Sequence, residues 1–283
     1  MMYQAGLVLE GGGMKGMYTA GVLEYLLEQD VEFANCYGVS AGACHLCSFV
    51  SRQRGRMYRV AVDYLEDKRY CSVQSLLKTG DLFGAQMCYD DIPNKLNKFD
   101  YETYDKYQGN AYAVVTNIRT GDPEYLPMKD MHVDIQAVRA SASLPLVSRN
   151  VKIGNEYYLD GGISDGIPIK KAIADGNRKN LVIMTKEVGY RRKPTEHLGI
   201  FKLKYRKYPA IYENMKKRHI VYNETLDFLE HAKITGEAFV IRPQKVSDIG
   251  RIEKDKNKLT ALYHEGYADA KRLYPQLLAY LQS

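Results

Sequence analysis

Residues 5–42 read AGLVLEGGGMKGMYTAGVLEYLLEQDVEFANCYGVSAG and contain two strand-to-helix connections in succession. Residues 5–10 predict a short buried strand, and apolar residues at helical spacing run from Met14 to Gln29. A second strand over 33–39 leads directly into a helix rich in small residues over 41–52. Strands that alternate with helices are typical of a mostly parallel sheet covered on both faces. We therefore expect a three-layer α/β/α fold.

The rest of the chain fits this class and has no convincing linker. A single domain over residues 1–283 is expected, with the motifs described below within 9–172 and a basic part, 189–283, packed on it. Residues between about 54 and 110 are expected to line or cover a site. The other expected elements are strands at 111–117 and 124–127, a helix at 132–141, a hairpin at 151–159, a helix at 168–174, strands at 181–185 and 238–242, and a helix at 256–281.

The composition favours a cytoplasmic protein. There is no signal-peptide pattern at the start of the sequence and no apolar run of the ~20 residues that span a bilayer. The five cysteines, an odd number, favour free thiols. Cys44 and Cys47 form a C-x-x-C, which suggests a redox or zinc site. No second C-x-x-C or paired histidine motif completes a zinc set, so buried thiols in a helix are the better interpretation.

Three short motifs have the residue types that acyl transfer requires. Gly38-Val39-Ser40-Ala41-Gly42 is a G-x-S-x-G between a strand and a helix, where small neighbours let a nucleophilic serine occupy a sharp turn. An ordinary turn with Ser40 as a helix cap is equally compatible with this motif alone. Asp160-Gly161-Gly162 follows an expected strand, so Asp160 is a candidate general base, although a D-G turn is the simpler explanation.

The third motif is the glycine run Gly11-Gly12-Gly13, followed by Lys15 and Gly16. Consecutive glycines expose backbone N–H groups that can bind an oxyanion. The same residues also spell the dinucleotide pattern G-x-G-x-x-G, which requires an acidic residue at the end of the next strand. Asp30 and Glu32 precede that strand instead of ending it, which disfavours a nucleotide site.

Taken together and in this order, the three motifs resemble those of the patatin-like phospholipase family. The block Ala140-Ser141-Ala142-Ser143-Leu144-Pro145 also resembles a small-residue segment of that family, and the similarity runs from Leu7 to at least Ala172. Residues 241–270 are similar to small bacterial members. The resemblance implies a patatin-like fold and hydrolysis of lipid carboxylic esters, as in a phospholipase A, a lysophospholipase or a carboxylesterase.

The resemblance also implies the roles of individual residues. Ser40 is then the nucleophile and Asp160 its catalytic partner in a Ser–Asp dyad, which forms and hydrolyses an acyl-enzyme without a metal or cofactor. Gly11, Gly12 and Gly13 form the oxyanion hole. Lys15 stands where many members carry Arg, so it either braces the loop or contacts an anionic group. The supporting positions of the motifs are Gly16, Gly38, Gly42, Gly161 and Gly162.

Two alternatives remain open. A Ser–His–Asp triad requires a histidine after Asp160 and leaves His197, His219, His231 and His264, none of which lies in a glycine-rich or loop-end context. A catalytically weak or inactive lipid-binding protein on the same fold is the other, since a motif does not guarantee turnover.

The positive charge lies in the last third of the chain. Residues 189–283 contain 19 Lys and Arg against 11 Asp and Glu, whereas the whole chain has a net charge of +6. Aromatic and aliphatic residues interleave with cations over 190–193, 201–208 and 215–218. A solvated face is the simpler interpretation, and peripheral contact with an anionic membrane is the more specific one. No nucleic-acid-binding motif accompanies these residues, so nucleic acid is not an expected partner.

Overall fold

The computed structural model describes residues 1–246 and 248–283. The strands are β1 (Met2–Leu9), β2 (Glu32–Val39), β3 (Asn110–Asn117), β4 (Pro123–Pro127), β5 (Val151–Ile153), β6 (Glu156–Asp160), β7 (Asn180–Ile183) and β8 (Ala238–Ile241). The helices are α1 (Met17–Glu28), α2 (Ala41–Val50), α3 (Arg56–Val62), α4 (Val73–Thr79), α5 (Tyr101–Asp105), α6 (Met131–Ser141), α7 (Ile169–Ala174), α8 (Leu198–Lys204), α9 (Pro209–Ile234) and α10 (Lys256–Gln282). Shorter turns are the 3₁₀ segments η1 (Gly13–Gly16) and η3 (Gly161–Ile163), and η2 (Met87–Leu96) is π-helical.

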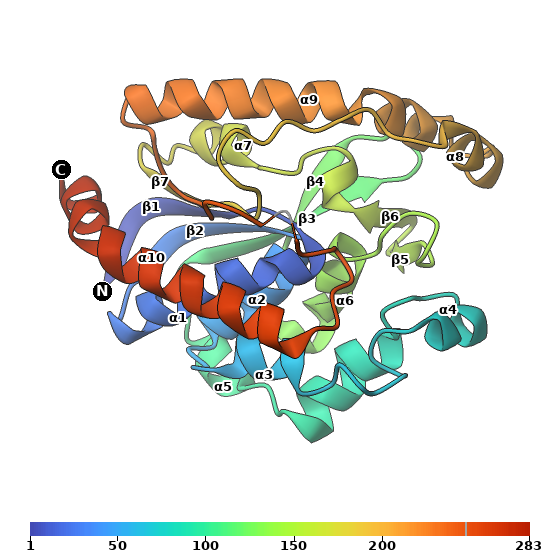
Figure 1. Cartoon of the computed structure of the whole chain (residues 1–283), viewed down its shortest axis with the longest axis horizontal. Helices are drawn as coiled ribbons and strands as arrows, with labels where there is room; N and C mark the ends of the chain where they lie inside the picture. The colour runs from blue at the N-terminus through green and yellow to red at the C-terminus, as the bar shows by residue number, and fades with distance from the viewer. Residues whose placement is uncertain (247) are drawn as a thin grey trace.

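The strands form one sheet in the order β5-β6-β3-β2-β1-β7-β8, with β4 paired to β3. The pairs among β3, β2, β1, β7 and β8 are parallel, and β4, β5 and β6 add antiparallel pairs. Figure 1 places α7 and α9 over one face of the sheet and α1, α2 and α10 over the other. The predicted three-layer α/β/α fold is therefore confirmed.

Strand β1 illustrates why both faces need a cover. Its alternate residues Leu7 and Leu9 belong to the core that includes α1, α2 and α10. Val8 points the other way, into the core that includes residues of α7 and α9. All three side chains are fully buried, as expected for a central parallel strand with helices on both sides.

Each element predicted from the sequence is present, with ends shifted by a few residues. The main omission is α9, a helix over residues that the sequence presents as basic runs. Its buried residues recur at helical spacing between charged ones, and they are Ile211, Met215, Tyr222, Thr225, Leu226, Leu229 and Ala232. A second difference is that Met14 lies in η1, so α1 begins at Met17 instead.

Among the helices of the described residues, none is long and apolar enough to cross a bilayer.

Helices α1 and α10 are in direct backbone contact through two glycines. A Cβ atom at Gly21 would lie 1.9 Å from the Tyr263 carbonyl oxygen, and one at Gly266 would lie 2.1 Å from the Tyr18 carbonyl oxygen. The Tyr18 hydroxyl also donates to Asp269 at 2.7 Å. This packing joins the last helix to the first, and on it we propose that residues 1–283 act as one domain.

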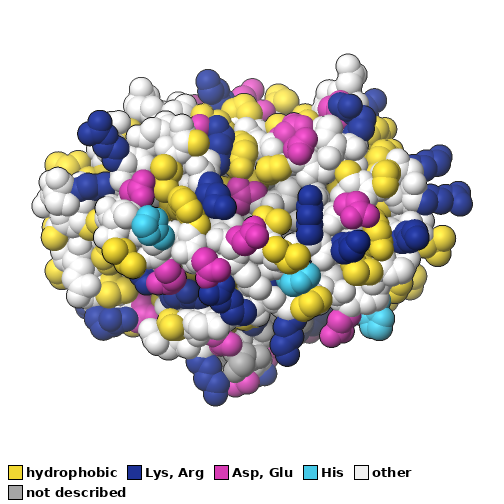
Figure 2. All heavy atoms as spheres, turned by 90° about the horizontal axis from the view of Figure 1, so that it is seen from above, with side chains coloured by type: hydrophobic (Ala, Val, Ile, Leu, Met, Phe, Trp, Pro, Cys, Tyr) yellow, Lys and Arg dark blue, Asp and Glu magenta, His cyan; other side chains and the backbone are white. Residues whose placement is uncertain are grey.

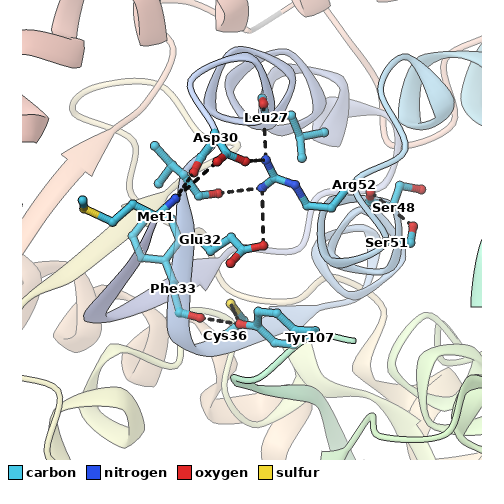
Figure 3. A network of polar contacts seen from close by, with 11 residues as sticks. Met1, Leu27, Asp30, Glu32, Phe33, Cys36, Ser48, Ser51, Arg52 and Tyr107 are labelled. Carbon is cyan, nitrogen blue, oxygen red and sulfur yellow. Dashed lines mark hydrogen bonds and ion pairs between the residues drawn. The ribbon is translucent and has the colours of Figure 1, made fainter. Parts of the chain in front are cut away.

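A polar network closes the first βαβ unit at the end of α2 that is farthest from Ser40 (Figure 3). Arg52 follows α2 with φ 56°. Its guanidinium donates to the Val31 carbonyl at 3.0 Å and to Asp30 Oδ1 at 2.5 Å. The amino group of Met1 lies 3.5 Å from Asp30 Oδ2. These contacts fix α2 against the α1–β2 turn, and thereby hold the helix that begins after Ser40.

Candidate active site

Ser40 lies on a sharp turn between β2 and α2. Its backbone has φ 55° and ψ −120°, a conformation that costs a non-glycine residue free energy and is typical of functional sites. Strand and helix can approach this closely because the residues two positions before and after Ser40, Gly38 and Gly42, are glycines. A Cβ atom at Gly38 would lie 2.6 Å from Ala43 Cα, and one at Gly42 would lie 2.6 Å from the Leu9 carbonyl oxygen.

The register of β3 brings Asp160 beside Ser40. Val114 pairs with Val39, the last residue of β2, and the next residue, Val115, pairs with Asp160, the last residue of β6. Strand β4 pairs with Tyr112–Thr116 of β3, so β6 continues the edge at which β2 ends. Ser40, which directly follows β2, and Asp160, the last residue of β6, are 120 positions apart in the chain but lie at neighbouring rows along the same edge of β3.

The Asp160 carboxylate is buried, and within the described residues only one of its two oxygens has a hydrogen-bond partner. Its Oδ1 atom accepts a hydrogen bond from the Gly162 N–H at 2.7 Å, while its buried Oδ2 atom has no hydrogen-bond partner within the described residues. Burial raises the pKa of Asp160 above its ordinary value, and the nearby Ser40 hydroxyl and Arg218 guanidinium lower it in part. Gly161 is required at this turn because a Cβ atom there would lie 2.2 Å from the Val114 carbonyl oxygen.

Ser141 connects the Ser40 turn to β3 by two hydrogen bonds. The Ser40 N–H donates to Ser141 Oγ at 2.8 Å, and Ser141 Oγ donates to the Val114 carbonyl at 2.6 Å. Ser141 is fully buried, so α6 fixes the backbone of Ser40 to β3 through one hydroxyl. The Ser40 N–H is consequently not available to a ligand.

The glycine run lies against the Ser40 side chain. A Cβ atom at Gly11 would lie 3.0 Å from Ser40 Cβ, and one at Gly12 would lie 2.4 Å from Thr185 Oγ1. Gly13 adopts φ 59°, which favours glycine. In the described part of the chain, the N–H groups of these three glycines donate no hydrogen bond to the backbone. They are therefore free to bind an anion.

The two other predicted loop residues have packing contacts. The Lys15 ammonium donates to the Val246 carbonyl at 2.8 Å, which favours the bracing role among the two considered from the sequence. Burial lowers the pKa of Lys15. Gly16 leaves room for His45, since a Cβ atom at Gly16 would lie 2.9 Å from His45 Nε2.

Glu10, which precedes the glycine run, is a site residue that the sequence analysis did not single out. It is 1% exposed. Its Oε2 atom accepts hydrogen bonds from the N–H and hydroxyl of Thr185 at 2.6 and 3.1 Å, and its Oε1 atom accepts one from the Tyr222 hydroxyl at 2.5 Å. Glu10 thus joins the glycine run to the end of β7 and to α9. The sequence did contain a signal for this role, because Glu10 is a carboxylate that directly follows the apolar residues 5–9.

Two cavities meet at Ser40. The larger, of about 170 Å³, is mostly apolar and includes many residues between 56 and 101, which confirms the expectation that this segment lines the site. The smaller contains Asp160, the glycine run and four cations, Lys186, Arg192, Arg218 and Arg251. Ser40 lines both. A substrate with an apolar part and a polar part could therefore present the bond between them to the Ser40 hydroxyl.

Within the described residues, the histidines that follow Asp160 lie outside both cavities, whereas His45 and three of the cysteines line the apolar one. Across residues 1–246 and 248–283, none of His197, His219, His231 and His264 lines either cavity. His45 does line the apolar cavity, and burial lowers its pKa to about 4. All five cysteines are free thiols, and burial raises the pKa of Cys44 to about 12. No group of three or more potential metal ligands occurs among the described side chains.

Comparisons with known proteins find matches in sequence and in structure. The family model described as patatin-like phospholipase matches residues 7–173, and a domain of unknown function (DUF6363) matches residues 208–282. The chain is similar to the uncharacterized protein YjjU of Escherichia coli, with 32% identity over 63% of this chain and 51% of that protein. It is 24% identical to the probable lipid hydrolase 463L of Invertebrate iridescent virus 6, over 63% of this chain and 66% of that protein.

Among solved structures, VipD from Legionella pneumophila aligns with a TM-score of 0.47 and 13% identity, over 97% of this chain and 67% of that one. The chain spans about half of the length of the E. coli relative and about two thirds of that of the viral one.

The buried Ser141 hydroxyl gives a test of how the Ser40 turn is held. Ser141→Ala leaves the Ser40 N–H without its acceptor, so the free energy of unfolding is expected to fall by about 1–3 kcal/mol. Urea denaturation of the wild type and the variant measures this change. Ser143→Ala is the matched control, because the Ser143 hydroxyl donates to the Arg139 carbonyl in the same helix and does not contact Ser40. Equal stability of the two variants would contradict the bracing role of Ser141.

Proposed function

Because this chain belongs to the patatin-like phospholipase family, we propose that it is a lipid acyl hydrolase with Ser40 as nucleophile and Asp160 as general base. The observation that carries the proposal is the β3 register, in which Val114 and Val115 pair with the strand ends that bear the two residues. The unpaired Oδ2 atom of Asp160 within the described residues is the acceptor that the Ser40 proton requires. The natural ester is a phospholipid, a lysophospholipid or a simpler carboxylic ester.

The proposed reaction has two balanced steps. Ser40 Oγ attacks the ester carbonyl carbon while its proton passes to Asp160, and collapse of the tetrahedral intermediate breaks the bond to the alcohol, which leaves with that proton. Water then attacks the acyl-enzyme, again with Asp160 as the base, and releases the fatty acid and the free Ser40 hydroxyl. Each proton in this scheme moves between protein groups, substrate and water.

The glycine run is the proposed oxyanion hole. The N–H groups of Gly11, Gly12 and Gly13 make no hydrogen bond among the described residues, and Gly11 lies beside the Ser40 side chain. Each donor that is correctly aimed at the developing charge contributes about 3–4 kcal/mol to the transition state. The Ser40 N–H is engaged by Ser141, so the loop is the better source of these donors.

Membrane contact is proposed through α8 and the turn that follows it. Ile200 and Leu203 are exposed, at 55% and 74%. Leu203 lies between the exposed cations Lys202 and Lys204, and Ile200 precedes them by two residues. Cations stand next to hydrophobic side chains at the end of the molecule that carries α8 (Figure 2), although acidic residues are mixed among them elsewhere on that face. This combination suits an anionic lipid surface, where apolar groups enter the acyl boundary and cations meet headgroups.

The dyad is tested by hydrolysis of p-nitrophenyl esters and a phospholipid. Ser40→Ala is expected to abolish turnover, and Asp160→Asn is expected to lower kcat by about 10²–10⁴-fold, because an amide cannot accept the proton. Circular dichroism and thermal unfolding check that both variants fold. Ser164→Ala is the matched control and is expected to retain most of the activity. The Ser164 hydroxyl is hydrogen-bonded to the Thr116 hydroxyl, which in turn donates to the backbone carbonyl of Asp160.

The pH profile adds a second readout. Burial raises the pKa of Asp160 above 3.8, and the base works only when ionised, so kcat/KM is expected to fall as the pH drops through a value above 3.8.

Full activity of Asp160→Asn would place the base elsewhere and return the histidines to consideration. A folded wild type that is inert towards every ester would favour an inactive lipid-binding protein on this fold.

The membrane proposal is tested by sedimentation with vesicles of phosphatidylglycerol and phosphatidylcholine. Replacement of Lys202, Lys204, Arg206 and Lys207 by Gln is expected to weaken association by about 10²–10³-fold, because four cations at about 1 kcal/mol each near the surface contribute about 4 kcal/mol. The matched control changes Lys170, Lys171, Lys256 and Lys258, which lie outside α8 and its turn. Unchanged sedimentation of the first variant would show that this segment makes no contact with the membrane.

A further inference from the structure

Four cations surround the smaller cavity at Ser40, and they come from separate parts of the chain. Lys186 follows β7, Arg192 lies in the loop after it, Arg218 lies on α9, and Arg251 precedes α10. All four line the cavity together with Ser40 and Asp160. All four follow the last sequence motif, Asp160-Gly161-Gly162, and three of them lie within residues 189–283. That part therefore completes the cavity instead of only covering the sheet.

These cations have few internal partners. Within the described residues, none of the four forms an ion pair with a carboxylate. Arg218 Nε donates to the Gly162 carbonyl at 2.5 Å. The Arg192 guanidinium lies 4.1 Å above the Tyr222 ring, and its buried Nε atom has no hydrogen-bond partner among the described residues. The remaining N–H groups can therefore donate to a ligand.

The neighbouring carboxylates offset this charge only in part, because Glu10 attracts Lys186 and Asp160 attracts Arg218, which sets two negative charges against four positive ones. Both Glu10 oxygens are occupied by Thr185 and Tyr222, and Asp160 is required by Ser40. Lys186 is 5% exposed, and burial lowers its pKa to about 8. Burial and the nearby Arg192 and Arg251 lower the pKa of Arg218 to about 9. Burial and mutual repulsion disfavour the charged forms of these side chains, and a bound anion would stabilise them. Clustered cations of this kind are typical of an anion-binding site.

The position of the cluster relative to Ser40 indicates which part of a substrate bears the anion. The apolar cavity lies on one side of Ser40 and suits an acyl chain, whereas the cations lie on the side of Asp160 and the glycine run. With the acyl chain in the apolar cavity, the ester bond lies at the Ser40 hydroxyl and the alcohol portion faces the cations. Guanidinium groups match the oxygens of a phosphate with two parallel hydrogen bonds.

We infer that Lys186, Arg192, Arg218 and Arg251 form a phosphate-binding subsite that selects acyl esters whose alcohol portion carries a phosphate. This inference rests on the proposed function, because the headgroup is placed relative to the acyl ester at Ser40. Arg218 also holds the Gly162 carbonyl beside Asp160, so Arg192 and Arg251 are the better residues for a test. Within the described residues, neither side chain donates a hydrogen bond to Ser40, Asp160 or the glycine run.

The test compares two substrates that differ only in the phosphate, a monoacylglycerol phosphate and the monoacylglycerol with the same acyl chain. Both are presented to the full-length protein at equal mole fraction in micelles of a neutral detergent. Wild type is expected to favour the phosphate substrate in kcat/KM by at least about tenfold, and Arg192→Gln or Arg251→Gln to reduce that ratio by about tenfold. Arg192→Lys keeps the charge and is expected to retain part of the preference.

Arg206→Gln is the matched control, because Arg206 is an exposed arginine outside both cavities. The ratio is expected to be unchanged in this variant, which separates the subsite from a general effect of positive charge. Equal kcat/KM for the two substrates in the wild type, or ratios that do not respond to either arginine variant, would overturn the inference.

Binding to the Ser40→Ala protein is measured in parallel by calorimetry, so a failure of hydrolysis is distinguished from a failure of the subsite. If the wild type is inert but Ser40→Ala binds the phosphate lipid more tightly than the neutral one, the subsite stands and the proposed function fails. Inorganic phosphate is the third ligand. If it binds as tightly as the phosphate lipid while both lipids are hydrolysed equally, the site holds a free anion and the headgroup assignment is wrong.

Discussion

The pairing of β3 with two different strands along one edge is the constraint on which the candidate site depends. Val114 pairs with the end of β2 and Val115 with the end of β6, so the register alone brings Ser40 and Asp160 together. A shift of one residue in either pairing would turn one side chain to the opposite face of the sheet. The glycines on both sides, Gly38 and Gly161 among them, remove the Cβ atoms that this approach cannot accommodate.

The C-terminal part of the chain is coupled to this site by buried polar contacts. Glu10 joins the start of the glycine run to Thr185 and to Tyr222 on α9, and Lys15 joins η1 to the Val246 carbonyl. Arg218 on α9 reaches the Gly162 carbonyl next to Asp160. Since a buried polar group that loses its partner costs free energy, α9 and the loops around it are part of how the site is held.

The sequence predicts the elements that carry strong local signals and misses those that depend on distant partners. Motifs with obligatory glycines, such as Gly38–Gly42, specify a turn that few other residues can form, so their position was predictable. Helix α9 was not predicted because its buried residues are separated by charged ones, although Pro209 in its first turn is a recognised helix start. The cation cluster and the role of Glu10 depend on the packing of β7 and α9, which no local pattern encodes.

The central claim is that Ser40 is an activated nucleophile, and covalent labelling tests it most directly. An alkyl fluorophosphonate transfers its phosphonyl group to an activated serine oxygen with loss of fluoride, and peptide mass spectrometry locates the adduct. We expect one adduct on the peptide that contains Ser40, its absence in Ser40→Ala, and much slower labelling in Asp160→Asn. Labelling of a different serine, or no adduct on Ser40 in the folded wild type, would contradict the account.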